Sequence, residues 1–198
     1  MEFIETLYVK NGNILNLEYH LERMERTAGY FKFQVPSLEF KVPSSEFKES
    51  RIRITYNQYG IKNIEYFPIK KREFKKFKLI EINFNYSFKY KNRNIFQKIF
   101  KTWNSELKTL PLNIDEFILI KNNLITDTTI SNLAFFTGSE WLTPKYPLLK
   151  GTKREELIKK GFLKEENIHK SDLKYFKKMA MMNAILGFRE IEEYDIIS

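Results

Sequence analysis

The chain has 198 residues, a formal net charge of +9 and no cysteine. A hydrophobic fraction of 42%, with 16% aromatic residues, predicts a folded globular protein and excludes an intrinsically disordered chain. The absence of cysteine excludes disulfides and thiolate chemistry, and no apolar run reaches the ~20 residues that span a bilayer. We therefore expect a cytoplasmic protein without a membrane segment.

The positive charge is spread along the whole chain. Its densest run, residues 70–78, holds six basic residues, but it is a single stretch that also contains a glutamate. This pattern favours a solvated face over a nucleic-acid interface, and we expect no nucleic-acid partner. Attraction to anionic small molecules is compatible with the charge.

The first part of the chain predicts a small antiparallel sheet with one helix. Residues 3–10 alternate and are rich in β-branched and aromatic types, and Asn11-Gly12 is a strong hairpin-turn signal. From Leu17 to Tyr30, apolar residues recur at three- and four-residue steps, which is typical of an amphipathic helix. Further strands are expected at 51–56, 62–67 and 77–84.

The second part predicts hairpins and three helices. Expected helices cover 92–107, 153–160 and 171–176. Expected strands cover 116–120, 124–126, 133–136, 141–142 and 179–182, the last of them buried. We predict an α+β fold with a small N-terminal α+β domain at 1–86 and a larger C-terminal domain of antiparallel strands at 87–198.

Two stretches stand out for chemistry. Lys89-x-x-Asn92-Arg93 lies between a strand and a helix, and residues 124–154 read LITDTTISNLAFFTGSEWLTPKYPLLKGTKR. A lysine near a helix start is usually an exposed surface residue, and an aspartate before a turn is usually only a turn former. The order in which the two stretches follow one another along the chain favours a functional role for both residues over these ordinary interpretations.

These motifs resemble the class IV (fold type IV) pyridoxal-phosphate enzymes, which include aminodeoxychorismate lyases and branched-chain and D-amino-acid aminotransferases. The resemblance covers about residues 4–186. It implies that Lys89 holds pyridoxal 5'-phosphate as a Schiff base and is the catalytic residue. It also implies that Asp127 pairs with the pyridine nitrogen. The common pattern has glutamate at this position, and aspartate is shorter by about 1.5 Å. Ser131 and Asn132 of the same motif, and Asn183 further on, are further implied cofactor-binding residues.

The resemblance further implies residues that bind the cofactor phosphate. His20-Leu-Glu-Arg23 is similar to the family's His-x-x-Arg, whose arginine binds the phosphate. Gly151-Thr152-Lys153 opens a helix whose free backbone N–H groups suit a phosphate. Thr152 also begins a Thr-x-x-Glu capping box, so we expect it to cap that helix. Thr152 and Lys153 are therefore candidate phosphate ligands.

The resemblance leaves the reaction open between two kinds of enzyme. Asn183-Ala184 is similar to a segment of aminodeoxychorismate lyases and tilts the prediction toward a lyase that makes 4-aminobenzoate and pyruvate on the folate route. An aminotransferase for branched-chain or D-amino acids is the alternative, and a non-catalytic basic binding module is a remoter one.

Arg51 and Arg53 share one strand face. Arg53 is the candidate substrate ligand, although charges on an edge strand are an equal alternative. A homodimer is implied.

A metal site is not expected. The chain has two histidines, His20 and His169, far apart in sequence, and it has no thiolates. No Walker loop and no Rossmann glycine pattern occurs among the seven glycines.

Overall fold

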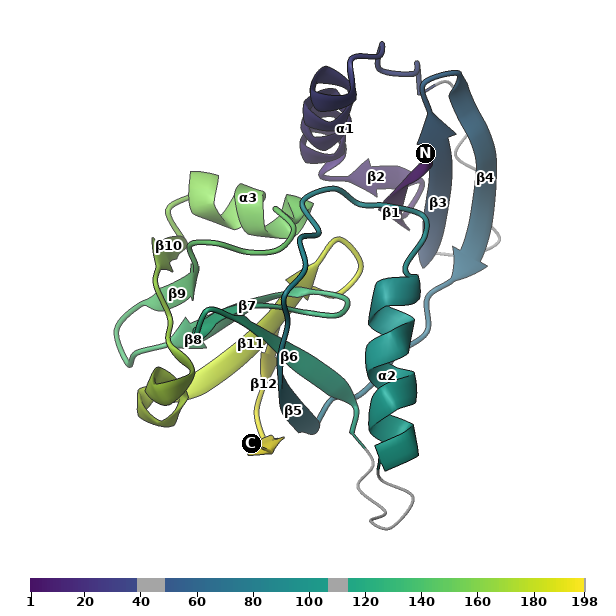
Figure 1. Ribbon diagram of the computed structural model, residues 1–198. Coiled ribbons are helices and arrows are strands. Elements are labelled where there is room, and N and C mark those ends of the chain that lie inside the picture. Colours follow the sequence, from purple (N-terminus) through teal and green to yellow (C-terminus); the bar gives the residue numbers. More distant parts are fainter. Residues whose placement is uncertain (39–48, 107–113, 198) are drawn as a thin grey trace.

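The computed structural model describes residues 1–38, 49–106 and 114–197, with side chains at all of these positions except 103–106. Within this part of the chain the structure contains two sheets and three α-helices (Figure 1). No helix of the described residues is long and apolar enough to cross a membrane.

The smaller sheet is antiparallel and has the strand order β2-β1-β3-β4. Its strands are β1 (Phe3–Lys10), β2 (Asn13–Leu15), β3 (Glu49–Asn57) and β4 (Gly60–Pro68). Asn11 and Gly12 both have positive φ, as a two-residue hairpin turn requires. Helix α1 (Leu17–Phe31) packs on this sheet through Met24, which is fully buried with Phe3 and Tyr56.

The larger sheet is mixed. Along its main path the strand order is β10-β9-β8-β7-β6-β5-β13, and β11 pairs with both β8 and β12. The strands are β5 (Lys76–Glu81), β6 (Glu116–Lys121), β7 (Leu124–Thr128), β8 (Asn132–Phe136), β9 (Trp141–Pro144), β10 (Leu163–Glu166), β11 (Lys178–Asn183), β12 (Gly187–Ile191) and β13 (Asp195–Ile197). The centre is antiparallel as expected, whereas the pairs β5–β6, β5–β13 and β9–β10 are parallel.

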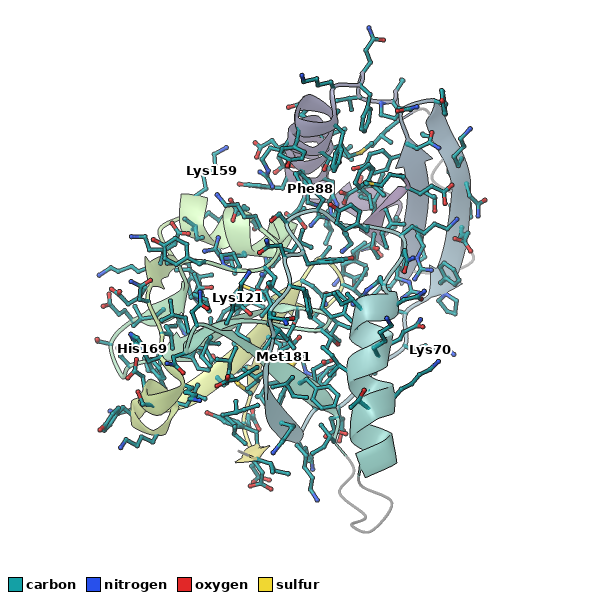
Figure 2. The ribbon with its side chains drawn as sticks, in the orientation of Figure 1. Lys70, Phe88, Lys121, Lys159, His169 and Met181 are labelled. Atoms are coloured by element: carbon teal, nitrogen blue, oxygen red, sulfur yellow. The ribbon has the colours of Figure 1, made fainter. Side chains whose placement is uncertain are left out.

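Helix α3 (Thr152–Lys159) lies between α1 and the larger sheet, and α2 (Asn94–Glu106) runs beside β6 (Figure 1). A 3-10 helix, η1 (Lys170–Tyr175), lies further along the chain. Helix α3 touches α1, where the Asn16 side chain donates to Glu156 Oε2 at 2.5 Å. Strand β11 lies in the core, and Met181, labelled in Figure 2, is fully buried.

Most expected elements are confirmed, and the exceptions have physical causes. The strand expected at 77–84 ends at Glu81. Strands β10, β12 and β13 were not predicted, because each is short and lacks a clear alternating pattern. The capping role expected for Thr152 was wrong: Gly151 is the N-cap of α3, and its carbonyl accepts from the Glu155 N–H at 3.0 Å.

The strand pairing bears on how the chain divides. Strand β5 precedes residue 86, yet it pairs with β6 and β13 in the larger sheet. A division between β4 and β5 would leave both sheets whole, whereas a boundary at 86 would separate β5 from its partners. The expected division at 86 stays a prediction that this pairing disfavours.

Candidate active site

The segment around Lys89 is tied to the first strand. The Lys89 carbonyl accepts from the Ile4 N–H at 2.9 Å, and the Lys91 N–H donates to the Glu2 carbonyl at 2.9 Å. These bonds continue the pairing of β1 beyond the small sheet. They hold Lys89 where the two sheets meet, immediately before α2.

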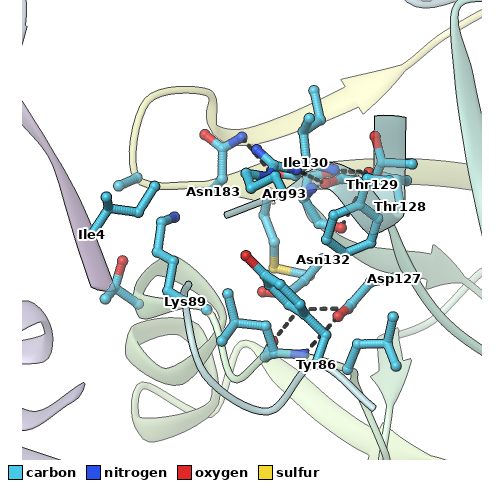
Figure 3. Close-up of a pocket in the computed structure, with 18 of the residues that line it drawn as sticks. Ile4, Tyr86, Lys89, Arg93, Asp127, Thr128, Thr129, Ile130, Asn132 and Asn183 are labelled. Carbon is cyan, nitrogen blue, oxygen red and sulfur yellow. Dashed lines mark hydrogen bonds between the residues drawn. The ribbon is translucent and has the colours of Figure 1, made fainter. Parts of the chain in front are cut away.

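Lys89 opens on two cavities. We call the first the inner pocket; its lining includes Ile4, Arg23, Tyr86, Lys89, Arg93, Asp127, Thr128, Thr129, Ile130, Ser131, Asn132, Leu149, Gly151, Thr152, Met182 and Asn183. The second, the outer cavity, shares Ile4, Lys89, Arg93, Ile130, Asn183 and Ala184 with it and extends over β3 and β4. Lys89 and Asp127 reach the inner pocket from opposite sides (Figure 3).

The Lys89 amine is electrostatically unusual. Desolvation and the nearby Arg23 lower its pKa to about 7, with further lowering from Arg93 and Arg53 and an opposing effect from Glu5. A large share of the amine is therefore neutral at physiological pH. A neutral amine is a nucleophile and can accept a proton, whereas an ammonium can do neither.

Asp127 is a buried carboxylate that forms no ion pair with any of the described residues. Its Oδ1 accepts from Asn132 Nδ2 at 2.6 Å and its Oδ2 accepts from the Leu149 N–H at 2.9 Å. Burial raises its pKa to about 7, although these hydrogen bonds oppose the rise. A cation placed in the pocket beside this group would offset that desolvation.

Asn132 is fixed by a close approach to Gly151. Its amide nitrogen also donates to the Leu149 carbonyl at 2.8 Å. A Cβ added to Gly151 would lie 2.0 Å from Asn132 Oδ1, so a side chain at 151 would displace Asn132. Only glycine lets the start of α3 lie this near to β8. The predicted motif residues at 127, 132 and 151 therefore form one unit.

Arg23 belongs to a fully buried ionic cluster. Its Nε donates to Glu5 Oε1 at 2.9 Å and its Nη2 donates to Glu5 Oε2 at 2.5 Å. His20 Nδ1 lies 2.6 Å from Glu5 Oε2. Burial raises the pKa of Glu5, but Arg23 and His20 together lower it by more, so the pKa falls to about 2. The cluster fixes the Arg23 guanidinium in the wall of the inner pocket.

The remaining predicted ligands differ in position. Thr152 lines the inner pocket, and its hydroxyl lies 3.5 Å from His20 Nε2. The Lys153 side chain instead pairs with Glu156 at 2.8 Å and does not contribute to the pocket lining described above. A side-chain role for Lys153 toward the pocket is therefore not supported by this geometry.

Ser131 and Asn183 also line the inner pocket, but both side chains are used within turns. The Ser131 hydroxyl lies 2.9 Å from Thr128 Oγ1. Asn183 Oδ1 accepts from the N–H groups of Ile185 and Leu186 at 2.9 and 2.8 Å. These residues shape the pocket wall.

Arg51 and Arg53 lie together in the outer cavity, as strand alternation predicted. Their guanidinium carbons stand 4.5 and 5.3 Å from the centre of the Phe67 ring. Each has a buried Nε without a hydrogen-bond partner in the described structure. Two adjacent cations with unused donors form a site suited to an anion.

Sequence reasoning missed two residues of the site, Tyr86 and Glu5. Tyr86 lines the inner pocket and donates from its hydroxyl to the Tyr90 carbonyl at 3.0 Å. Glu5 lies on the same buried face of β1 as Phe3 and Leu7, and a charge on the inward face of a strand was the available signal.

The fold is that of the fold type IV aminotransferases. Residues 100–194 match the model of the family "Amino-transferase class IV". An uncharacterised protein of Haemophilus influenzae is 32% identical over 191 residues, which cover 92% of this chain and 97% of that one.

Solved structures of similar fold are known. A structure called "putative 4-amino-4-deoxychorismate lyase" from Haemophilus somnus has a TM-score of 0.80 at 25% identity, covering 94% of this chain and 97% of that one. A hypothetical aminotransferase of Mycobacterium tuberculosis in its PLP-bound form has a TM-score of 0.80 at 16% identity, covering 98% and 81%. This chain belongs to the class IV aminotransferase family, a family of enzymes that act on small molecules.

The inner pocket fits the cofactor that this family implies. Pyridoxal phosphate needs an amine for its aldehyde, an anion for its ring nitrogen and donors for its phosphate. Lys89 and Asp127 face each other across the pocket (Figure 3), so the first two needs are met at opposite ends. Arg23, Thr152 and the glycine start of α3 supply the donors.

Proposed function

We propose that this protein is a pyridoxal-phosphate-dependent lyase that converts 4-amino-4-deoxychorismate to 4-aminobenzoate and pyruvate. The observation that carries the proposal is the position of Lys89, which opens on the inner pocket and on the outer cavity. One amine can therefore serve a cofactor on one side and a substrate on the other.

The proposed roles follow from charge and position. Arg23, Thr152 and the first amides of α3 bind the phosphate. Asp127 keeps a proton on the ring nitrogen. Bound pyridoxal phosphate supplies an electron sink for the carbon next to the substrate nitrogen. Lys89, neutral in large part near pH 7, takes the proton from that carbon and returns a proton as pyruvate leaves.

The outer cavity supports a substrate with two carboxylates. Arg51 and Arg53 present unused donors there, and Arg72, Arg93 and Lys70 also line it. Burial, followed by the neighbouring Arg53, lowers the pKa of Arg51, and Glu65 opposes this effect, so the two arginines repel each other. An anionic substrate would relieve this repulsion. We propose Arg53 as the first carboxylate ligand.

The lyase reading predicts pyruvate release without a second substrate. Incubation with 4-amino-4-deoxychorismate alone should yield 4-aminobenzoate and pyruvate in equal amounts over many turnovers, because a lyase regenerates its cofactor form in each cycle. Pyruvate can be followed with a coupled dehydrogenase. Arg53→Gln should raise KM more than it lowers kcat, and Lys62→Gln, an exposed change on the neighbouring strand, serves as the control.

The alternative is an aminotransferase for branched-chain or D-amino acids. The family match and the likeness to the Mycobacterium tuberculosis aminotransferase favour it. Such an enzyme needs a keto-acid acceptor and shows ping-pong kinetics. Turnover that depends on a keto acid, with no pyruvate from 4-amino-4-deoxychorismate, would replace the lyase proposal. We also propose that the protein acts as a homodimer, which sedimentation can test.

Arg23→Lys should weaken cofactor binding about tenfold or more. The lysine keeps the charge beside Glu5 but loses the fork that can contact Glu5 and a phosphate together. A charge-assisted hydrogen bond is worth roughly 1.5–3 kcal/mol, or about 10- to 150-fold in affinity. Titration of the cofactor-free protein, followed by tryptophan fluorescence, measures the change.

Arg23→Ala is a poorer test, because it leaves Glu5 buried without its main cation, at a cost of about 3–5 kcal/mol in stability. The matched control is Arg26→Lys, at an exposed position on the same helix. Equal cofactor affinity in Arg23→Lys and in the parent would contradict the phosphate role.

A further inference from the structure

His20 connects the buried ionic cluster to the inner pocket. It is fully buried, with Nδ1 2.6 Å from Glu5 Oε2 and Nε2 3.5 Å from the Thr152 hydroxyl. Thr152 is the first residue of α3 and lines the pocket. The two ring nitrogens thus face a carboxylate on β1 and a pocket hydroxyl on α3, and the roles proposed above leave His20 unused.

The protonation state of His20 decides what the Thr152 hydroxyl can do. Glu5 is ionised and can only accept, so Nδ1 keeps its proton. In the neutral ring Nε2 can only accept, so a hydrogen bond between the two groups uses the single proton of the Thr152 hydroxyl. In the charged ring Nε2–H donates to Thr152 Oγ1, and the hydroxyl proton is then free for a ligand in the pocket.

The contact geometry permits this exchange. A separation of 3.5 Å is long for a hydrogen bond, so the hydroxyl gives up little when it turns away from the ring. The groups acting on His20 are Glu5, Arg23 and Lys89. Burial lowers the pKa of His20, and the two cations add to that effect while Glu5 opposes it. An anion beside Arg23 and Lys89 would offset the repulsion from both cations.

We propose that His20 is a positioning residue that takes up a proton when a phosphate group enters the inner pocket, and that the charged ring turns the Thr152 hydroxyl toward that phosphate. The inference rests on the proposed phosphate site at Arg23 and the start of α3. It adds a coupling between phosphate binding and protonation, and a positioning role for a histidine that touches no ligand itself.

The coupling can be read from the histidines directly. The chain has only two, and His169 is exposed on the larger sheet's side of the molecule (Figure 2), so His169→Gln assigns both imidazole signals. NMR titration of the cofactor-free full chain against pH, in inorganic phosphate and in chloride at matched ionic strength, gives each midpoint. Phosphate should raise the His20 midpoint by about one pH unit or more and leave His169 unchanged.

A matched pair of variants tests the path through the hydroxyl. Thr152→Ser keeps the hydroxyl and should keep the shift of the His20 midpoint. Thr152→Ala should show a smaller shift than Thr152→Ser, because only the part due to Arg23 and Lys89 remains, and should bind inorganic phosphate about tenfold more weakly below the His20 midpoint.

The outcomes separate this inference from the phosphate site itself. The backbone amide NMR signal of residue 152 reports whether phosphate binds at the start of α3. If phosphate shifts this signal saturably but leaves the His20 midpoint unchanged, the coupling alone is refuted. An equal shift in the serine and alanine variants would refute the role of the hydroxyl. No movement of the residue-152 amide would refute the phosphate site, and the coupling with it.

Discussion

Lys89→Met should reduce turnover by well over roughly 10²–10⁴-fold, the usual contribution of one positioned acid–base group. The loss should exceed that range because the same amine would also hold the cofactor covalently. Borohydride treatment of the parent with pyridoxal phosphate should place a stable label on the peptide that contains Lys89. The variant should take up no such label.

The pH dependence of stability gives a second readout for Lys89. Its pKa is about 7 in the folded protein against an ordinary value of 10.5. Between these values the unfolded chain binds more protons than the folded one, so the free energy of unfolding due to this group rises with pH from about 7 to about 10.5. Denaturant unfolding across this range should show that rise in the cofactor-free parent and lack it in Lys89→Met.

Lys91→Met is the matched control. Lys91 lies two residues further on, its side chain is 53% exposed, and it pairs with Glu2 at 2.9 Å. This change should leave labelling and the pH profile of stability as in the parent. A label on Lys91, or a parent protein that binds no pyridoxal phosphate, would overturn the assignment of Lys89.

Asp127→Asn should slow turnover by orders of magnitude while the protein still binds the cofactor. A neutral amide cannot hold a proton on the ring nitrogen, so the electron sink weakens. Steady-state turnover and visible absorbance of the same samples separate the two effects. Asp195→Asn, an exposed change on β13, is the control. Unchanged turnover in Asp127→Asn would make Asp127 only a structural residue of β7.

The stability change at Asp127 should run opposite to that at Lys89. Its pKa is about 7 in the folded protein and 3.8 ordinarily, so the folded chain binds more protons between these values. The free energy of unfolding due to this group therefore falls as pH rises from about 4 to about 7. Asp127→Asn should lack that fall. Profiles of the parent and the variant that run parallel over this window would contradict the burial of an unpaired carboxylate.

Local elements with strong patterns were predictable. The Asn11-Gly12 turn, helix α1 and the buried β11 depend on near neighbours in the chain, and their residue types report them directly. Strands β10 and β13 were not predictable. Each pairs in parallel with a strand distant in sequence, and each has three or four residues, too few to show an alternation.

The sequence alone determined the family and most of the candidate ligands, because the order of the motif residues at 89, 127, 132 and 151 can be recognised along the chain. Only the tertiary structure decided which side chains share the pocket. It placed Lys153 with Glu156 and left Thr152 beside His20. It also brought Glu5 onto Arg23, since burial of one charge requires a partner from another element. That pairing depends on how β1 packs against α1, which no local spacing encodes.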